Sequence, residues 1–368
     1  MKVIFVGDYQ TNDILAAPTK VAKELFNHFS LINPEIFYYS YFQEGAKYSR
    51  YKKIFGKNKL DNNVYRLGLF PFVINILKQK PDIVFALTPA VYYLPILIIR
   101  KIVQFKFVYY VHSVNKCVLN NYTDLTRFQK FRFLFIEKIS VKYSDLIFTL
   151  SNKELELLKQ NYPKTKQNIN VVNNGINYYN IKKKSYRVDQ VLNIICVGNF
   201  QRREKAYDIL LGALNDLKFS VNLTICSHTK QNDSTIKISK NINLIYYTFN
   251  EVQLRKKISQ NDLFIISSSY EPFSIALLEA MSTGIPFIST DQVGLTERFV
   301  DGVLQNQVIP FNNSPTLMKK ILDFLNMTEN QKEQIGEKGI EFAKNYTWDL
   351  VALQTFNRLN QIYEYVKI

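Results

Sequence analysis

Residues 270–290 read YEPFSIALLEAMSTGIPFIST, and we expect this segment to form a loop, a helix and the start of a strand. Pro272 suits the first helical position, because its missing N–H would have no helical partner there in any case. Gly284 can end the helix in a left-handed conformation. The sequence therefore predicts a helix over 272–282, followed by a buried strand over 286–289.

Two carboxylates, Glu271 and Glu279, stand eight residues apart in this segment, which corresponds to about 12 Å along a helix. The backbone N–H groups of Phe273, Ser274 and Ile275 lie between them, and free amides at a helix start attract anions. A nucleotide-sugar carries hydroxyls, a diphosphate and further hydroxyls in that order. One glutamate could hold the sugar, the amides the phosphates and the other glutamate the ribose. The alternative is a surface helix with two solvated glutamates.

Apolar runs alternate with helical patterns along the whole chain, which is typical of parallel sheets in α/β proteins. Polar residues at 180–187 predict a linker between two such regions. Strands are predicted at 2–6, 36–39, 82–87, 107–112, 146–149, 169–172, 192–197, 221–226, 242–246, 263–266 and 286–289. Further helices are predicted at 18–29, 127–142, 206–218, 251–259, 316–326, 331–345 and 348–366.

The positive charge of the chain is concentrated in its first half. Residues 1–184 hold 28 Lys and Arg against 12 Asp and Glu, whereas residues 185–368 hold 19 of each, for a net charge of +16. Basic clusters at 47–59 and 127–142 are interleaved with aromatic residues. This composition favours the surface of an anionic membrane, with a solvated basic surface as the alternative. Nucleic acid is not expected as a partner, because no motif for binding it is present.

Length and cysteine content limit the class of protein. With 368 residues, the chain is expected to form two domains. Cys117, Cys196 and Cys226 are far apart and odd in number, which fits neither a disulfide framework nor a zinc site and indicates a reducing cytoplasm. The longest apolar stretch, at 85–99, is interrupted by threonine and proline, and a buried strand and helix are predicted there.

Four positions outside 270–290 could carry chemistry. Strand 192–197 is followed by Gly198, which lets the backbone turn, and by Lys205, whose ammonium could lie beside a diphosphate. His112 and Gly7 stand at the ends of strands, where ligands bind in open parallel sheets. The alternatives are a solvated charged loop around Lys205 and a packing role for His112.

Taken in order, these motifs resemble those of the retaining glycosyltransferases of family 4, which have the GT-B fold. The segment from Glu271 to Glu279 resembles the E-x7-E signature of that family, and GNFQRREK at 198–205 resembles its phosphate loop. Weaker matches follow the same order along nearly the full length: MKVIFVG at 1–7, KPDIVFALT at 80–88, FVYYVHS at 107–113, YSDLIFTLSN at 143–152 and VNNGIN at 172–177.

The resemblance implies an α/β protein of GT-B architecture, with two Rossmann-like domains whose parallel sheets face a central cleft. A C-terminal helix would cross back to the N-terminal domain. Residues 1–178, with helix 348–368, would form the acceptor-binding domain. Residues 179–347 would form the domain that binds the nucleotide-sugar donor.

Residue roles follow from the same resemblance. Glu271 and His112 are expected to act at the donor sugar, and Lys205 at the leaving diphosphate, as catalytic residues. Glu279 would hold the ribose. The other expected donor-binding residues are Gly198, Asn199, Arg202, Arg203, Phe273, Ser274, Ile275, Glu297 and Gly7. No metal or other cofactor is expected, because no Asp-x-Asp stands at a strand end.

Three positions depart from the pattern of the family. Asn199 stands where the family has an arginine, so Arg202 or Arg203 must replace it, or the phosphate clamp is weaker. Ala16-Ala17 stands where the family often has two glycines, which puts in doubt how closely this loop approaches the phosphates. Ala206 replaces a further glycine.

The sequence thus predicts a hexosyltransferase that moves a hexose-type sugar, with retention, from a UDP- or GDP-sugar to a lipid-linked or oligosaccharide acceptor. The expected setting is bacterial surface polysaccharide biosynthesis, such as O-antigen, capsule or lipopolysaccharide. The protein would be cytoplasmic and peripheral on the inner face of the cell membrane, through its basic N-terminal half. The alternatives are a nucleotide-sugar-binding GT-B protein with weakened catalysis, and a GT-B epimerase or phosphorylase.

Overall fold

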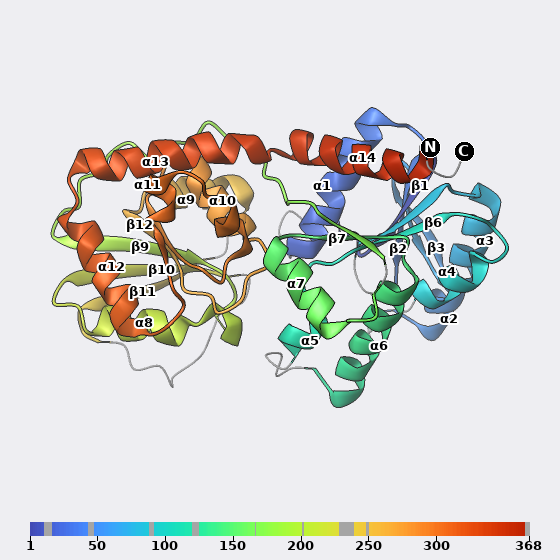
Figure 1. The fold of residues 1–368 in the computed structure, drawn as a ribbon, viewed down its shortest axis with the longest axis horizontal. Helices are drawn as coiled ribbons and strands as arrows, with labels where there is room; N and C mark the ends of the chain where they lie inside the picture. Colours follow the sequence, from blue (N-terminus) through green and yellow to red (C-terminus); the bar gives the residue numbers. More distant parts are fainter. Residues whose placement is uncertain are drawn as a thin grey trace. The chain divides into compact units, whose positions relative to one another are not determined.

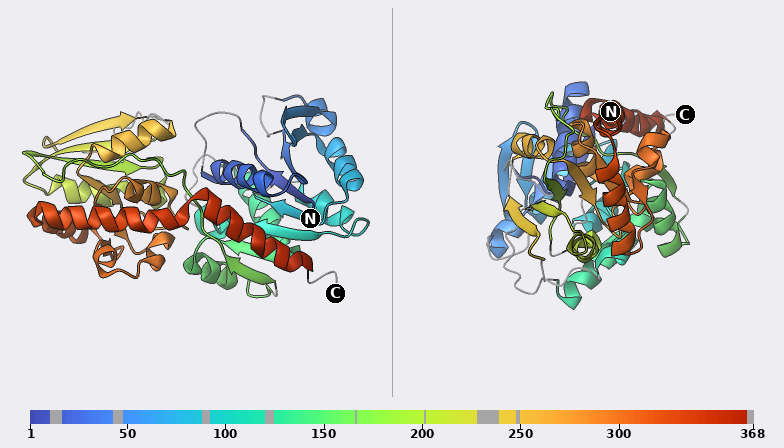
Figure 2. Two further views of the ribbon diagram at one scale, coloured as in Figure 1. Left: turned by 90° about the horizontal axis from the view of Figure 1, so that it is seen from above. Right: turned by 90° about the vertical axis from the view of Figure 1, so that its left-hand side faces the viewer.

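The computed structural model describes residues 1–10, 17–42, 48–87, 92–119, 125–165, 167–200, 202–227, 239–247 and 250–364. The chain divides into two compact units, of which the first contains Met1–Gly175 and Trp348–Ile368 and the second contains Ile176–Thr347. In each unit, helices cover both faces of one sheet (Figures 1 and 2). The sequence predicted this α/β architecture and placed the boundary at 178 and 179, close to where the units divide.

The sheet of the first unit has the strand order β3-β4-β2-β1-β5-β6-β7-β8 among the described residues. All neighbouring pairs are parallel except β3 with β4. The strands are β1 Val3–Gly7, β2 Ile36–Tyr41, β3 Lys57–Asp61, β4 Val64–Leu67, β5 Ile83–Ala86, β6 Lys106–Tyr110, β7 Leu146–Thr149 and β8 Asn168–Val171. The helices are α1 Ala17–Ile32, α2 Arg50–Phe55, α3 Leu69–Gln79, α4 Tyr93–Ile99, α5 Asn115–Val118, α6 Arg127–Tyr143, α7 Asn152–Asn161 and α14 Trp348–Glu364.

The C-terminal helix α14 packs on α1 within the first unit (Figure 1). The rings of Phe29 and Phe356 meet edge to face, with centroids 5.4 Å apart. Trp348, at the start of α14, is buried, and a Cβ on Gly175 would lie 2.9 Å from its ring. Gly175 is therefore required where the chain passes this indole, and the prediction that the last helix joins the N-terminal domain is confirmed.

The second unit contains a parallel sheet with the strand order β11-β10-β9-β12-β13-β14 among the described residues. Its strands are β9 Val191–Val197, β10 Ser220–Cys226, β11 Ile242–Tyr247, β12 Leu263–Ile266, β13 Phe287–Thr290 and β14 Val308–Ile309. Its α-helices are α8 Tyr207–Asn215, α9 Glu251–Ser259, α10 Ile275–Ser282, α11 Gly302–Gln305, α12 Ser314–Asn326 and α13 Glu329–Ala343. Short 3-10 helices are η2 Arg203–Lys205, η3 Gly294–Arg298 and η4 Lys344–Tyr346.

Central strands are mostly apolar because both of their faces are covered. Strands β1, β5, β12 and β13 contain only buried residues. The sequence did not predict the edge hairpin of β3 and β4, because β3 is polar, exposed and without alternation. Within the described residues, no helix combines the length and the apolar character needed to cross a membrane.

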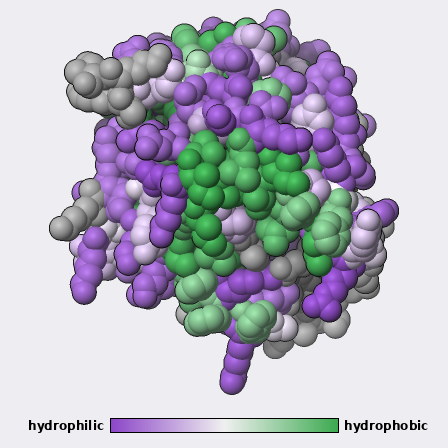
Figure 3. All heavy atoms as spheres, turned by 90° about the vertical axis from the view of Figure 1, so that its right-hand side faces the viewer, coloured by the Kyte–Doolittle hydropathy of each residue, from purple (hydrophilic) through white to green (hydrophobic). Residues whose placement is uncertain are grey.

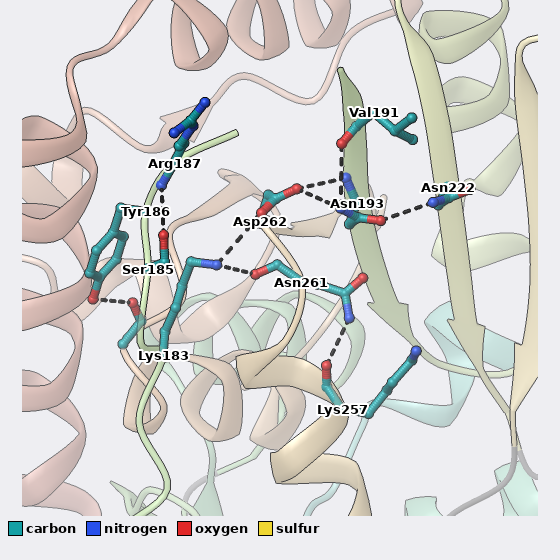
Figure 4. A network of polar contacts seen from close by, with 11 residues as sticks. Lys183, Ser185, Tyr186, Arg187, Val191, Asn193, Asn222, Lys257, Asn261 and Asp262 are labelled. Atoms are coloured by element: carbon teal, nitrogen blue, oxygen red, sulfur yellow. Dashed lines mark hydrogen bonds and ion pairs between the residues drawn. The ribbon is translucent and has the colours of Figure 1, made fainter. Parts of the chain in front are cut away.

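The predicted linker at 180–187 is attached to the second unit by buried polar contacts (Figure 4). Lys183 donates to the carbonyl of Asn261 (2.6 Å), and its ammonium lies 3.7 Å from Asp262. Asp262 also accepts from the backbone and side-chain nitrogens of Asn193, each at 2.9 Å. Burial lowers the pKa of Lys183, and the charge of Asp262 opposes this shift. The linker is thus an integral part of this unit.

We predict that Lys183→Met lowers the stability of the second unit by about 1–3 kcal/mol, because it removes the buried donor to Asn261 and the cation beside Asp262. Thermal unfolding followed by circular dichroism measures the loss. Lys184→Met is the matched control, since Lys184 is exposed. Equal melting temperatures for the two variants would contradict the prediction.

Candidate active site

The loop after β9 folds a lysine back over a glycine. Gly198 has φ +153°, and a Cβ there would lie 3.0 Å from Cε of Lys205. The Tyr207 hydroxyl donates to the Gly198 carbonyl (3.2 Å), which holds the turn closed. Ala206 follows η2 with φ +48°, a left-handed conformation that glycine adopts without strain. This explains why a glycine would suit position 206, where the sequence has alanine.

Lys205 forms an ion pair with Glu271, and both side chains are about one-fifth exposed. Two serines after β12 fix the lysine loop: Ser267 Oγ donates to the Lys205 carbonyl (2.8 Å), and the Ser269 amide donates to the Glu204 carbonyl (2.8 Å). The predicted catalytic lysine and glutamate therefore meet at the carboxyl ends of β9 and β12. A cation beside an accessible carboxylate can bind an anionic ligand if the carboxylate yields its place.

The segment that carries Glu271 is paired with the loop that carries Glu297. The Glu271 amide donates to the Gln292 carbonyl (3.1 Å), and the Gly294 amide donates to the Glu271 carbonyl (2.8 Å). The Leu295 amide donates to the Phe273 carbonyl (3.0 Å). The structure thus brings the G-x-x-E loop of 294–297 beside the first glutamate.

Helix α10 begins three residues later than the sequence predicted. It starts at Ile275, so Pro272 is not its first residue, and the expected helix over 272–282 is wrong at its start. Ser274 is the N-cap in a left-handed conformation with φ +81°, and its Oγ accepts from the Leu277 amide (3.2 Å). The capping serine moves the helix start, so the first-turn amides are those of Ile275 and Ala276 rather than of Phe273 and Ser274.

Glu279 lies in a buried ion pair that the sequence did not predict. Its Oε1 lies 3.1 Å from Nη2 of Arg255 on α9, and Arg255 is 1% exposed. Nη2 also lies 3.4 Å from Glu251, whereas Nε and Nη1 of Arg255 are buried and have no hydrogen-bond partner among the described residues. Arg255 and Ile258 lie three residues apart on the buried side of α9. This helical spacing from an apolar residue is the signal by which the sequence could have indicated that Arg255 is buried. The second glutamate is therefore held more rigidly than the first.

Asn199 stands where the family has an arginine, and Arg202 and Arg203, the two candidates to replace that arginine, have different surroundings. Arg202 lies 3.5 Å from Glu204, and its side chain is about one-third exposed. Arg203 is exposed. Lys205 contacts Glu271, and the two arginines stay candidates for a phosphate contact.

In the first unit, Gly7 and His112 come to the same edge of the parallel sheet. Gly7 ends β1, and His112 follows β6 by two residues. The imidazole hydrogen-bonds the backbone of Leu87, after β5, while its buried Nε2 has no partner among the described residues. Burial lowers the pKa of His112 to about 4, so the ring is neutral at pH 7. The predicted Ala16-Ala17 loop lies outside the residues whose side chains are described.

Glu137 on α6 supports the segment that follows His112. It is fully buried and accepts from the Asn115 amide (2.7 Å) and from the Tyr162 hydroxyl (2.5 Å). Burial raises its pKa to about 7, and these hydrogen bonds oppose the rise. Sequence reasoning missed this residue because a single acidic residue in a basic helix gives no sign that it is buried.

Among the described residues, no three His, Cys, Asp or Glu side chains are arranged to hold a metal ion. Whether the reaction needs a metal is not decided by that arrangement, and the expected metal-free reaction stays a prediction.

Two family models match the chain. The model for glycosyl transferases group 1 matches residues 178–342, and the model for glycosyltransferase family 4 matches residues 36–178. Together they span residues 36–342.

Two similar proteins come from microorganisms. The chain is 27% identical over 210 residues to an uncharacterized glycosyltransferase of Methanocaldococcus jannaschii, covering 55% of this chain and 58% of that protein. It is 25% identical over 254 residues to an uncharacterized 41.2 kDa protein in the cps region of Klebsiella pneumoniae, covering 67% of this chain and 66% of that protein. Both matches span less than two thirds of the relative's length.

The fold is similar to that of solved structures. Sucrose-phosphate synthase from Thermosynechococcus elongatus superposes with a TM-score of 0.73 at 14% identity, covering 99% of this chain and 100% of that one. HepE from Anabaena in complex with UDP-glucose superposes with a TM-score of 0.68 at 14% identity, covering 98% and 100%. The predicted GT-B fold is confirmed by this likeness.

We predict that Arg255→Met lowers the stability of the second unit by about 3–5 kcal/mol, because it leaves the Glu279 carboxylate buried without its cation. Adding Glu279→Gln to Arg255→Met should recover part of that loss, since the two residues interact directly. Chemical denaturation of the wild type, both single variants and the double variant measures the coupling. Lys256→Met, at an exposed neighbour on α9, is the control. Additive losses would argue against a stabilising pair.

The lowered pKa of His112 predicts a pH-dependent stability difference. The unfolded ring binds a proton below about pH 6.5, whereas the folded ring does so only near pH 4. The wild type should therefore lose stability relative to His112→Asn as the pH falls from 6.5 toward 4, and the difference should be constant above pH 7. Urea denaturation of both proteins at a series of pH values measures this. A difference that does not change with pH would show that the ring titrates normally in the folded state.

Proposed function

We propose that this chain, which belongs to the glycosyltransferases of group 1 and family 4, is a retaining hexosyltransferase with a nucleotide-sugar donor. The observation that carries the proposal is the Lys205–Glu271 ion pair at the carboxyl ends of β9 and β12. Ligands of open parallel sheets bind at such strand ends.

In the proposed reaction the donor diphosphate takes the place of Glu271 beside the Lys205 ammonium. The bond between the anomeric carbon and the phosphate oxygen breaks, and the acceptor hydroxyl forms the new bond on the same face of the sugar. Lys205 and the first-turn amides of α10 neutralise the charge on the departing diphosphate, in fixed positions that need no reorganisation. The acceptor proton passes to the leaving phosphate, so no protein base is assigned.

Glu271, released from Lys205, is proposed to bind the donor-sugar hydroxyls. The neutral His112 ring is proposed as a hydrogen-bonding group of the first unit. Glu279 is proposed to hold the ribose. Gly198 and Glu297 complete the donor site. No metal or cofactor is part of this proposal.

The donor is proposed to be a UDP- or GDP-sugar. HepE, which shares the fold, binds UDP-glucose in its solved complex, and this supports a donor of that class. The acceptor is proposed to be lipid-linked or an oligosaccharide. The similarity to a protein in a cps region supports a role in bacterial surface polysaccharide biosynthesis.

The protein is proposed to act in the cytoplasm, on the inner face of the cell membrane. The support is the charge difference between the halves of the chain, because residues 1–184 hold all of the net positive charge. Lys and Arg near an anionic leaflet each contribute about 1 kcal/mol of attraction.

We predict that the purified protein slowly releases nucleotide from one donor in a panel of UDP-, GDP- and ADP-sugars. Glu271→Gln should reduce that release by about 100-fold or more, since it removes a charge at the reacting centre. Nucleotide release is measured by a coupled assay, and folding by circular dichroism. Glu341→Gln, at an exposed position on α13, is the control.

The outcomes separate the candidate functions. Release from no donor, with nucleotide-sugar binding retained in calorimetry, would favour a binding protein with weakened catalysis. Unchanged release in Glu271→Gln would remove this residue from the site. Epimerised or phosphorolysed sugar among the products would favour a different GT-B enzyme.

A further inference from the structure

A broad apolar area covers one side of the first unit (Figure 3). Exposed large side chains of this unit include Phe70 (56%) on α3, Ile98 (66%) on α4 and Ile102 (73%) just after α4. Tyr51 and Phe55 on α2 are exposed as well. We call these five residues the α2–α4 face. Single exposed apolar residues are ordinary on a protein surface, but a contiguous group of this kind marks a binding surface.

The aromatic part of the face is continuous. The ring centroids of Tyr51 and Phe55 are 5.3 Å apart, and those of Phe55 and Phe70 are 5.9 Å apart. Helix α2 contains no buried residue, so it lies on the unit without contributing to the core. Helix α3 packs against both α2 and α4, so the three helices that carry these side chains are neighbours.

The segment that carries the α2–α4 face has mostly positive charge. Residues 45–123, which include α2, α3 and α4, contain thirteen Lys and Arg but only Asp61 and Asp82 as acids. Lys52 and Lys53 are on α2 itself, and Lys101 stands beside Ile102. An apolar centre with a basic surround fits a surface that offers hydrocarbon below a layer of negative charge.

We infer that the α2–α4 face enters the headgroup layer of an anionic lipid bilayer. This inference rests on the proposed membrane location and names the part of the molecule that makes the contact. The lysines supply attraction that salt screens, whereas the apolar side chains supply contact that salt does not weaken. Binding should therefore have a component that persists at high salt.

Helix α6 offers a rival surface on the same unit. Phe128, Phe131 and Phe135 are exposed along one side of it, and the rings of Phe131 and Phe135 stack 6.2 Å apart. This stripe is one helix wide and consists of aromatic rings alone. The α2–α4 face spans three helices and includes exposed aliphatic side chains as well as aromatic rings.

Tryptophan emission can report which surface enters the bilayer, because the single native tryptophan, Trp348, is buried. Ile102→Trp places a reporter on the α2–α4 face and Phe131→Trp places one on α6. Val300→Trp, in the second unit, is the control, since Val300 is 91% exposed. Each full-length variant is mixed with phosphatidylglycerol vesicles whose acyl chains carry bromine near the headgroup.

We expect the Ile102→Trp emission to shift to the blue and to be quenched on the vesicles, while the other two reporters remain unchanged. In flotation at 1 M salt, the wild type should retain a bound fraction that Ile98→Ser combined with Ile102→Ser loses. Phe128→Ser combined with Phe131→Ser should retain it.

Three results would overturn the inference: quenching at position 131 without quenching at 102, complete release of the wild type at 1 M salt, or an emission shift at 102 that depends on protein concentration without vesicles. The last would identify a contact between copies of the chain. Nucleotide release in vesicle-free solution is measured on the same variants. Loss of membrane contact with release intact separates failure of this inference from failure of the proposed enzyme activity.

Discussion

A strand that is covered by helices on both faces has no solvated side, and this constraint determines where polar functional side chains can lie in each unit. Strands β1, β5, β12 and β13 are buried throughout. Polar side chains are therefore found where strands end, and in the second unit the loops after β9 and β12 bring Lys205 and Glu271 together, while the loop after β13 pairs with the segment of Glu271. The architecture thus positions the site through backbone hydrogen bonds between loops, before any ligand is present.

That positioning requires unusual backbone at a few residues. Ser274 and Ala206 are left-handed without being glycine, at a cost of about 1–2 kcal/mol each. Ser274 offsets part of this cost, because its hydroxyl caps α10. Ala206 directly follows Lys205 and Ser274 lies three residues after Glu271, so two of the four left-handed non-glycine residues in the described part of the chain adjoin this ion pair.

Most of the fold could be predicted from the sequence because apolar strands and amphipathic helices have clear periodicities. The start of α10 could not, because the rule that places proline at a helix start competes with serine capping, and here Ser274 caps the helix. Polar edge strand β3 lacked the alternation by which strands are recognised. The pairing of Arg255 with Glu279 joins residues distant in sequence, so a pattern of spacing could indicate a buried arginine but not its partner.

The two glutamates of the E-x7-E motif, Glu271 and Glu279, lie in different environments. Glu271 is partly exposed and paired with a lysine that is itself partly exposed, so a ligand anion can replace it at modest cost. Glu279 is buried against an arginine that is almost fully buried, and separating that pair would leave an uncompensated charge in the interior. The first carboxylate can therefore exchange partners during a reaction cycle. The second is held in one position by its buried cation.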